Sequence, residues 1–322
     1  MAVRPKILYL VSSHTSPTQV ARLAKRLVGS DPQAHVLIHH DAGSKEPLVA
    51  QNSPQHPRIR LYATPLRIEW GTFSIVQSFI STTRWALEHS DFDWLYWISG
   101  QHYPIKKAGE IGRELRESEF DAYVESFDIL ESTNWPPGEG FGRYYYQYFR
   151  LPQFRRYYVL PRRIKIGLRN VRNAINRTNG ILKIQGGYRK GPSFIGFRAL
   201  RPPFGEAFRC YGGSQWLTLR RATLTYIHNL LAERPALTRY YKRTFIPDES
   251  FLLTLLRNCS SLRLAPSNLL FAHWETEHSS SPRVLTVADI DVLLKSHAHF
   301  ARKFDLAVDG KVLDALDDHI DS

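Results

Sequence analysis

Apolar residues in the first third of the chain alternate between two spacings. Short continuous runs such as KILYLVSS and WLYWISG have the length of buried strands, whereas the stretches between them repeat apolar residues at helical spacing. Strands are predicted over residues 6–13, 35–41, 59–63 and 94–100, and helices over residues 17–28, 74–89 and 108–118. This alternation is typical of βαβ units, so we predict a parallel sheet flanked by helices.

The same pattern resumes in the second half. A strand is predicted over residues 121–126, and a later strand over 214–219 is followed by helices over 222–232, 247–258 and 285–297. No internal repeat or obvious linker separates the two parts. Because 43% of the residues are hydrophobic, the chain has enough apolar surface for one large core that both parts share.

Polar residues follow three of the predicted strands directly: Ser13-His14, His39-His40-Asp41 and Ser99-Gly100-Gln101. Ligands of open α/β sheets bind beyond the carboxyl ends of the strands, which places these residues around one crevice. The first loop lacks the G-x-G-x-x-G pattern, which disfavours a dinucleotide site. The sequence is still compatible with a mononucleotide site.

The formal net charge of +13 originates in one segment. Residues 141–205 contain no acidic residue and fifteen basic ones: Arg143, Arg150, Arg155, Arg156, Arg162, Arg163, Lys165, Arg169, Arg172, Arg177, Lys183, Arg189, Lys190, Arg198 and Arg201. Aromatic residues are interleaved with them. Such a segment suits nucleic acid, an anionic membrane surface or an acidic acceptor, but it is also compatible with a solvated basic face.

Two features bear on the compartment. No stretch reaches the roughly 18 uncharged apolar residues of a membrane span, and the start of the chain does not resemble a signal peptide. Cys210 and Cys259 cannot form a disulfide framework, and they lack metal-ligand spacing. We therefore expect a cytoplasmic protein, peripheral at the inner face of the membrane if the basic segment binds lipid.

The run Ile246-Pro247-Asp248-Glu249-Ser250 is a candidate for chemistry. Proline at the first helical position and acids in the first turn are also ordinary features of a well-capped helix. A carboxylate at that place nevertheless suits a general base, because the positive end of the helix dipole favours its ionised form. The other motifs of the chain decide between these interpretations.

Five separated motifs occur in a characteristic order: HHD ending at Asp41, SGQ-x-YP from Ser99 to Pro104, GSQW from Gly213 to Trp216, PDES from Pro247 to Ser250, and FARKFD from Phe300 to Asp305. Together they resemble the core-2/I-branching β-1,6-N-acetylglucosaminyltransferase family, which includes the peptide O-xylosyltransferases. The resemblance extends from the opening strand to about Asp305 and is weakest over the basic segment.

The resemblance implies a GT-A-like α/β fold, with a Rossmann-like, mostly parallel sheet flanked by helices and a basic, aromatic-rich insertion. Residues 1–126 would be the nucleotide-binding half and residues 127–205 the basic segment facing acceptor or membrane. Residues 206–322 would be the catalytic half that completes the same domain.

It also implies inverting transfer without a metal cofactor. Glu249 would be the base that deprotonates the acceptor hydroxyl, with Asp248 capping the helix beside it. Lys303 and Arg283 would stabilise the charge that develops on the UDP diphosphate, where other transferases use a divalent ion. The implied partners are UDP-GlcNAc or UDP-xylose and a hydroxyl on a glycan, lipid-linked saccharide or peptide.

Further positions are carried over by resemblance. Asp41 would bind the nucleoside of the donor, and Trp274 would pack on the acceptor sugar, although a core tryptophan is nearly as consistent. Glu125 and Arg143 would contact the acceptor. His102 stands where the family usually has Asp, which removes the basis for an acceptor contact by that side chain.

Two D-x-D sequences compete with this interpretation, because metal-dependent GT-A enzymes hold their ion with such a motif. Asp91-Phe92-Asp93 precedes a predicted strand, which places it at the end of the sheet away from the crevice. Asp289-Ile290-Asp291 fits a helix start in which Asp289 caps Thr286. His39 and His40 would point to opposite faces of a strand. We therefore predict no metal site.

The predicted function is a UDP-sugar-dependent glycosyltransferase. The alternative is a basic, non-catalytic module for anionic membrane or nucleic acid on a transferase-like scaffold. For the basic segment of the enzyme we expect contact with anionic membrane through residues 143–201 or with an acidic polysaccharide precursor, and no nucleic acid.

Overall fold

The computed structural model describes residues 4–49, 53–151, 161–178, 180–186, 193–276 and 281–321. Four of the basic residues named above, Arg155, Arg156, Arg189 and Lys190, lie outside them. The helices are α1 (Pro17–Ser30), α2 (Ser74–His89), α3 (Ala108–Glu117), α4 (Glu139–Tyr144), α5 (Arg162–Thr178), α6 (Arg221–Glu233), α7 (Pro235–Tyr241), α8 (Phe251–Arg257), α9 (Ile290–Lys295) and α10 (Lys311–Asp321), with 3-10 turns η2 (Pro247–Glu249) and η3 (Val287–Asp289).

The strands of the described residues form three sheets. The large sheet has the order β11 (Leu264–Ala265), β6 (Ala122–Asp128), β10 (Tyr211–Arg220), β4 (Trp94–Ser99), β1 (Ile7–Ser13), β2 (Ala34–His40) and β3 (Ile59–Leu61). A second sheet has the order β12 (Leu270–Ala272), β13 (Phe300–Arg302) and β5 (His102–Pro104). The third has the order β7 (Tyr146–Arg150), β9 (Ser193–Arg198) and β8 (Leu182–Gly186).

The large sheet is mostly parallel, as predicted. β3, β2, β1 and β4 pair in parallel, and β10 is antiparallel to both of its neighbours. The chain leaves β1 toward β2 and β3 and later returns to β4 on the other side of β1. The carboxyl ends of β1 and β4 therefore form a topological switch point, where ligands of such sheets bind. This architecture is compatible with the GT-A-like fold expected from the sequence.

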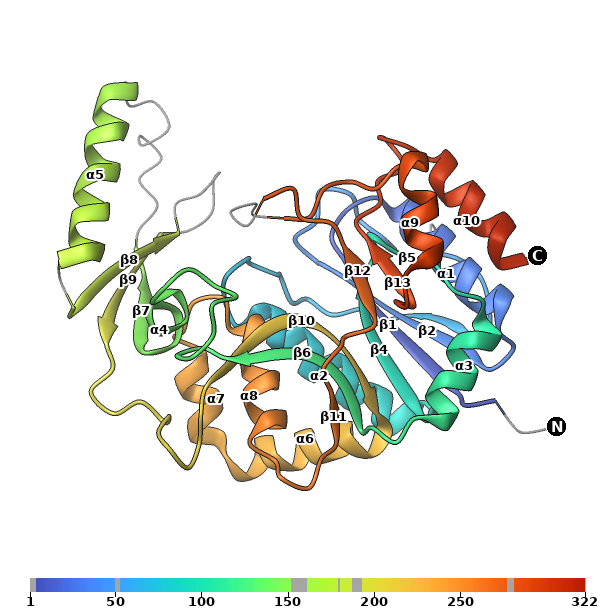
Figure 1. The fold of residues 1–322 in the computed structure, drawn as a ribbon, viewed down its shortest axis with the longest axis horizontal. Helices are drawn as coiled ribbons and strands as arrows, with labels where there is room; N and C mark the ends of the chain where they lie inside the picture. The colour runs from blue at the N-terminus through green and yellow to red at the C-terminus, as the bar shows by residue number, and fades with distance from the viewer. Residues whose placement is uncertain are drawn as a thin grey trace.

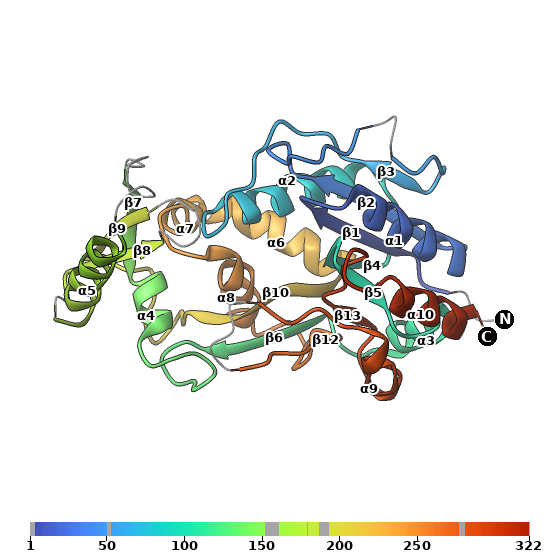
Figure 2. The same cartoon turned by 90° about the horizontal axis from the view of Figure 1, so that it is seen from above.

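Helices cover both faces of the large sheet (Figure 2). Alternate residues of β1 separate the two layers: Tyr9 and Val11 belong to the core beneath α1 and α10, whereas Leu8 and Leu10 belong to the core with α2, α6 and α8. This alternation follows from the two-residue period of a strand. Sheet β12–β13–β5 joins the α1 side, because Phe300 packs on Tyr9 and Tyr96.

Most predicted elements appear with bounds shifted by a few residues, and α2 has the predicted bounds. Two helices differ. The predicted helix 285–297 starts later, at Val287, because the Leu285 amide donates to the Lys303 carbonyl at 2.9 Å. The predicted helix 247–258 breaks at Ser250, whose hydroxyl lies 2.9 Å from the Tyr241 hydroxyl instead of capping α8.

The basic segment forms its own small substructure. We call β7, α5, β8 and β9 the basic lobe. Figures 1 and 2 place α5 at the end of the molecule opposite to α1 and α10. Within the described residues, no helix is long and apolar enough to cross a membrane.

Candidate active site

Two of the sequence motifs meet at one edge of the large sheet. The amide of Phe304 donates to the Gln101 carbonyl at 2.9 Å, which ties the FARKFD motif to the SGQ loop after β4. Gln19 of α1 reinforces this junction, because its side-chain amide donates to the carbonyls of Gly100 and Phe304. Two motifs some 200 residues apart in the sequence thus form one wall at the carboxyl end of β4.

The tryptophan of GSQW contacts residues of both motifs. Trp216 packs edge-on against His102 at a centroid distance of 4.8 Å, and the guanidinium of Arg302 lies 5.1 Å above its ring. Burial lowers the pKa of Arg302 to about 10, and its Nε has no hydrogen-bond partner among the described residues. The structure therefore adds Arg302 as a third cation beside Lys303 and Arg283, and of the three only Arg302 is strongly desolvated.

His102 is fully buried and neutral. Its Nδ1 accepts from the Ser99 amide at 2.9 Å and faces the Ser99 hydroxyl at 2.8 Å. Burial and the nearby Arg302 charge hold its pKa well below the usual value. This residue therefore shapes the turn after β4 from within the core.

Lys303 and Arg283, the two predicted diphosphate cations, lie on neighbouring segments. Lys303 Nζ donates to the Ser281 hydroxyl at 3.2 Å. The Arg283 amide donates to the His273 carbonyl at 2.9 Å, which places the residue beside the segment that carries Trp274. The exposed Trp274 follows β12, which pairs in parallel with β13. Arg283, Lys303 and Trp274 thus come from three adjacent segments.

The two cations differ in their electrostatic surroundings. Arg283 forms a bidentate ion pair with Asp289, one contact of which measures 2.9 Å, and this pairing raises the arginine pKa. Lys303 has no acidic partner among the described residues. The positive charge of Lys303 is therefore available to an anion. Arg283 could bind the same anion only by sharing or breaking its ion pair with Asp289.

Glu249 lies in η2, which contacts β10. The first residues of β10 lie at the same edge of the sheet as the SGQ loop. β10 runs antiparallel to β4 and β6, so its first residues lie at the carboxyl ends of those strands. The Thr254 hydroxyl accepts from the Tyr211 amide at 3.0 Å, which fixes α8 and the preceding η2 there. The described residues show no hydrogen bond or ion pair that joins Glu249 to Lys303 or Arg283.

Arg143 contacts Glu249 directly. Its Nη1 donates to Glu249 Oε2 at 2.5 Å, its Nη2 pairs with Glu139, and its guanidinium lies 4.4 Å from the centroid of the Trp135 ring. Burial alone would lower the pKa of this guanidinium, but a neighbouring phenol and the two carboxylates raise it. Arg143 therefore orients the carboxylate of Glu249, a contact that the sequence did not predict.

Asp248 does not cap the helix, so that prediction was wrong. Its side chain is buried, and its Oδ1 has no hydrogen-bond partner among the described residues. Burial, with the adjacent Glu249 charge, raises the pKa of Asp248 to about 7. Ile246 has a left-handed backbone (φ 52°), which turns Asp248 into the core and leaves Glu249 partly exposed.

Two further predicted residues hold backbone or neighbouring groups. Asp41 Oδ1 accepts from the amides of Gly43 and Ile68 at 2.9 and 2.8 Å, which joins two loops at the carboxyl end of β2. Glu125 Oε2 accepts from the Asn268 side chain at 3.1 Å, and desolvation raises the Glu125 pKa. Their roles toward donor and acceptor stay predictions.

A close approach of two strands occurs beside Glu125. Gly213 of GSQW has φ 155°, and a Cβ there would lie 2.0 Å from the Glu125 carbonyl oxygen. The register of β10 and β6 shifts immediately after this glycine. Only glycine fits here, which gives the first residue of this motif a structural role.

Asp91-Phe92-Asp93 lies where the sequence predicted it, and Asp289 has the predicted capping role. Asp93 accepts from the Lys6 amide at 2.8 Å before β4, at the edge away from the switch point. Asp289 Oδ2 accepts from the Thr286 amide at 2.8 Å, as in a capping box. Among the described residues, no group of three or more His, Cys, Asp or Glu side chains has the arrangement of a metal site. Cys210 and Cys259 are both free thiols.

One cavity lies away from these residues. It has a volume of about 580 Å³, and its lining includes Lys106, Glu110, Arg113, Glu114 and His299. Inside it, His299 Nε2 lies 2.7 Å from Glu114 and its Nδ1 2.5 Å from the Tyr96 hydroxyl. None of the predicted site residues lines this cavity.

Comparisons with known proteins agree with the motifs. The family model described as Core-2/I-Branching enzyme matches residues 164–294. Two proteins of Arabidopsis thaliana are similar over 117 residues: Beta-glucuronosyltransferase GlcAT14A, at 31% identity, and Beta-glucuronosyltransferase GlcAT14B, at 29%. Each alignment covers 35% of this chain and 26% of the relative, so the chain spans about a quarter of the length of the relatives that it matches.

The matched range begins inside α5 and ends inside α9. It contains the GSQW and PDES motifs with Trp274 and Arg283, whereas Asp41, the SGQ loop and Lys303 lie outside it. The match therefore includes part of the basic segment, where the motif resemblance was weakest. The family model thus matches residues 164–294 of this chain and agrees with the family that its motifs predict.

Proposed function

We propose that this protein is a glycosyltransferase that moves a sugar from a UDP-sugar to an acceptor hydroxyl by a single inverting displacement. The main support is the pairing of Arg143 with Glu249, which holds a partly exposed carboxylate in one orientation at the carboxyl edge of the sheet. A general base needs such fixed geometry, because its oxygen has to lie within hydrogen-bond reach of the proton that it accepts.

In this mechanism Glu249 accepts the proton of the acceptor hydroxyl as that oxygen attacks the anomeric carbon. The bond from the anomeric carbon to the UDP oxygen breaks on the opposite face, and its electron pair leaves with the diphosphate. Attack from the face opposite the leaving group inverts the anomeric centre. Arg143 keeps the carboxylate oriented, and the other carboxylate oxygen of Glu249 is then available to the acceptor.

Lys303 and Arg283 would stabilise the negative charge that grows on the leaving diphosphate, in place of a divalent ion. Of the two, Lys303 fits this role more directly because Asp289 already balances the charge of Arg283. Arg302 lies in the same motif and would add positive potential from beneath, through its position over Trp216.

The donor sugar could be GlcNAc or xylose, as the motif resemblance implies, or glucuronic acid, as the names of the Arabidopsis relatives suggest. The acceptor would be a hydroxyl on a saccharide, a lipid-linked saccharide or a peptide, with Trp274 and Glu125 on the acceptor side. Incubation with UDP-GlcNAc, UDP-xylose and UDP-glucuronate, followed by mass measurement of the product, would distinguish the three donors.

The decisive experiment measures UDP affinity by calorimetry in the presence of EDTA. It also measures turnover with whichever of the three UDP-sugars gives a product in the donor assay. Lys303→Ala should weaken UDP binding about tenfold or more, whereas Glu249→Gln should keep UDP binding and lose about a hundredfold to ten-thousandfold in turnover. Lys311→Ala, an exposed lysine at the start of α10, is the matched control and should change neither.

One result would contradict this function, and another would contradict only its metal-independent mechanism. Absence of UDP binding by the wild-type protein would favour the non-catalytic basic module. Turnover that disappears on chelation and returns with manganese would exclude the metal-independent mechanism while keeping the transferase.

A further inference from the structure

Helix α5 attaches to the rest of the protein through its polar side. The side-chain amide of Asn176 donates to the Ile184 carbonyl at 3.0 Å, and its oxygen accepts from the Ile184 amide at 2.8 Å. Lys183 Nζ also donates to the Asn176 carbonyl at 2.9 Å. Since β8 is an edge strand of its sheet, Asn176 takes the place of a further strand and covers an otherwise unpaired edge.

An apolar stripe of α5 lies to one side of this attachment and is largely exposed. Ile164, Leu168 and Val171 recur at the i, i+4 and i+7 positions of one helical face, and their exposed fractions are 48%, 47% and 58%. The partly buried residues of α5 include Lys165, Arg172, Ile175 and Asn176. Lys165, Arg172 and Asn176 share a polar side about a quarter turn around the helix from the stripe, and Ile175 continues the stripe at its C-terminal end. An amphipathic helix normally buries its apolar stripe, but here these three aliphatic side chains are in water, as is Ile166 on another side of the helix.

Basic side chains border the apolar stripe: Arg162, Arg163, Lys165, Arg169, Arg172 and Arg177 all belong to α5. No acidic residue occurs anywhere between residues 141 and 205. A second copy of this chain docked on the stripe would bring two such cationic surfaces together, which disfavours a homodimer. Nucleic acid would pair with the cations but would leave the stripe exposed to water.

A helix with aliphatic residues on one side and Lys and Arg on the other is suited to the interface of an anionic bilayer. Its 17 residues extend about 26 Å along the surface, which is enough for several headgroup contacts. We propose that α5 lies in the interface of an anionic lipid membrane, with Ile164, Leu168 and Val171 among the acyl chains and the flanking cations on lipid phosphates. This inference is independent of the transfer activity.

The test uses the full chain and its co-sedimentation with vesicles. Vesicles of phosphatidylcholine with about one third phosphatidylserine should pellet the protein, and added NaCl should weaken the binding. The double substitution Leu168→Glu/Val171→Glu should lower the binding at least about tenfold, since it removes two apolar contacts and adds two negative charges. Both side chains are exposed, so the midpoint of urea unfolding should stay unchanged.

The matched control is Val308→Glu, which changes an exposed valine (60%) near α10 at the opposite end of the molecule. It should bind vesicles as the wild type does. Equal pelleting by vesicles of pure phosphatidylcholine would overturn the anionic-lipid assignment.

Unchanged vesicle binding by the double variant would overturn the role of the stripe. Concentration-dependent dimerisation, or binding to an oligonucleotide, without vesicle binding would instead assign this surface to a second copy or to nucleic acid. UDP binding, measured in parallel, would separate this result from the proposed function.

Discussion

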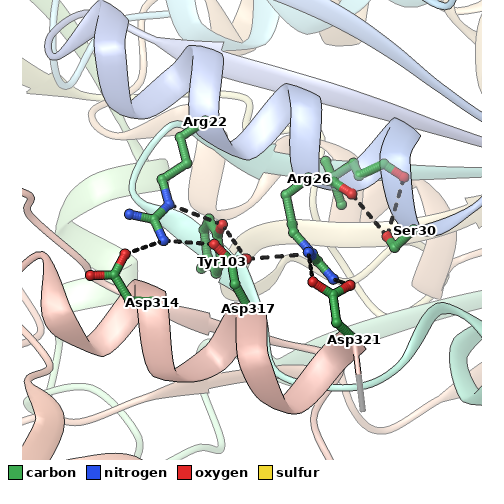
Figure 3. A network of polar contacts seen from close by, with 8 residues as sticks. Arg22, Arg26, Ser30, Tyr103, Asp314, Asp317 and Asp321 are labelled. Atoms are coloured by element: carbon green, nitrogen blue, oxygen red, sulfur yellow. Dashed lines mark hydrogen bonds and ion pairs between the residues drawn. The ribbon is translucent and has the colours of Figure 1, made fainter.

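Helices α1 and α5 have similar amphipathic sequences and opposite placements. α1 buries Val20, Leu23, Ala24 and Leu27 against the large sheet, and its polar side is bound by α10. Figure 3 shows that contact: Arg22 pairs with Asp314 and Asp317, and Arg26 pairs with Asp321. α5 binds the protein with its polar side and exposes its apolar stripe. The apolar stripe of α1 is therefore used for folding, whereas that of α5 is available for an external partner.

The comparison shows what an amphipathic pattern predicts. It indicates that one face of a helix has to leave water, but it does not specify what covers that face. The difference between α1 and α5 follows from their neighbours. A nearby sheet offers α1 an apolar surface, whereas the edge of β8 offers α5 only peptide groups, which a polar side chain such as Asn176 can satisfy.

The largest expected effect is the cost of truncating the buried stripe. Leu23→Ala in α1 should lower the free energy of unfolding by about 2–5 kcal/mol, because it leaves a cavity in the core. Leu168→Ala in α5 should change it by less than about 0.5 kcal/mol, because this side chain is exposed. Urea unfolding of both variants measures the difference. Equal losses would show that the stripe of α5 is buried in solution.

Replacing the buried carboxyl group of Asp248 should raise the free energy of unfolding, whereas Leu23→Ala lowers it. The folded pKa of Asp248, about 7, lies above its value in an unfolded chain. Its contribution to stability is therefore fully present below about pH 4 and is lost as the pH rises toward 7. Asp248→Asn cannot ionise, so its free energy of unfolding should exceed that of the wild type by a few kcal/mol at pH 8. At pH 4 the two proteins should be similar.

Urea unfolding at both values of pH checks this prediction. Asp318→Asn makes the same charge change at an exposed position and should show no such pH dependence. A gain for Asp248→Asn that is equal at both pH values would contradict the assigned cause.

The attachment of α5 should depend on one amide. Asn176→Ala removes both hydrogen bonds to Ile184 and should destabilise the docking of α5 by about 1–3 kcal/mol, because the edge of β8 loses its partner. Hydrogen exchange should then become faster at the Ile184 amide and along α5. The control Asn170→Ala, on an exposed face of the same helix, should leave exchange unchanged.

The smallest effect should come from the ion pairs of α1. Asp317 accepts from Arg22 at 2.6 Å and from the Tyr103 hydroxyl at 2.7 Å. Asp317→Asn should cost about 1 kcal/mol, and high salt should reduce this difference because the pairs are partly exposed. Asp318→Asn on the same helix is the control. A cost of several kcal/mol would show that the network is far less hydrated than its exposure indicates.

Sequence reasoning was most accurate where burial alone sets the pattern. The helix 74–89 and the strand from Trp94 were found because their apolar residues face a core on one or both sides. α5 was not predicted, since its apolar residues alternate with cations and the helix has no acidic residue in its first turn. α10 was not predicted either, although its buried residues recur at helical spacing.

The candidate site shows the same division. Motif order pointed to Glu249, Lys303 and Arg283, and the structure places the last two on adjacent segments. The sequence could not reveal that Arg143 binds Glu249, that Asp289 forms an ion pair with Arg283, or that Arg302 lies above Trp216. Those contacts join residues from 6 to 106 positions apart, and chain distance carries no information about them.

By itself the sequence determined the βαβ order, the strand ends that form the switch point, the excess of cations in residues 141–205 and the motifs that agree with the family match. These depend on local spacing and residue type, which short-range sterics and burial translate directly into structure. Only the tertiary structure decided which carboxylate Arg143 orients, which way Asp248 points and which side of α5 meets water. Each of these depends on which groups compete for the same partner, and that competition exists only once the segments are packed together.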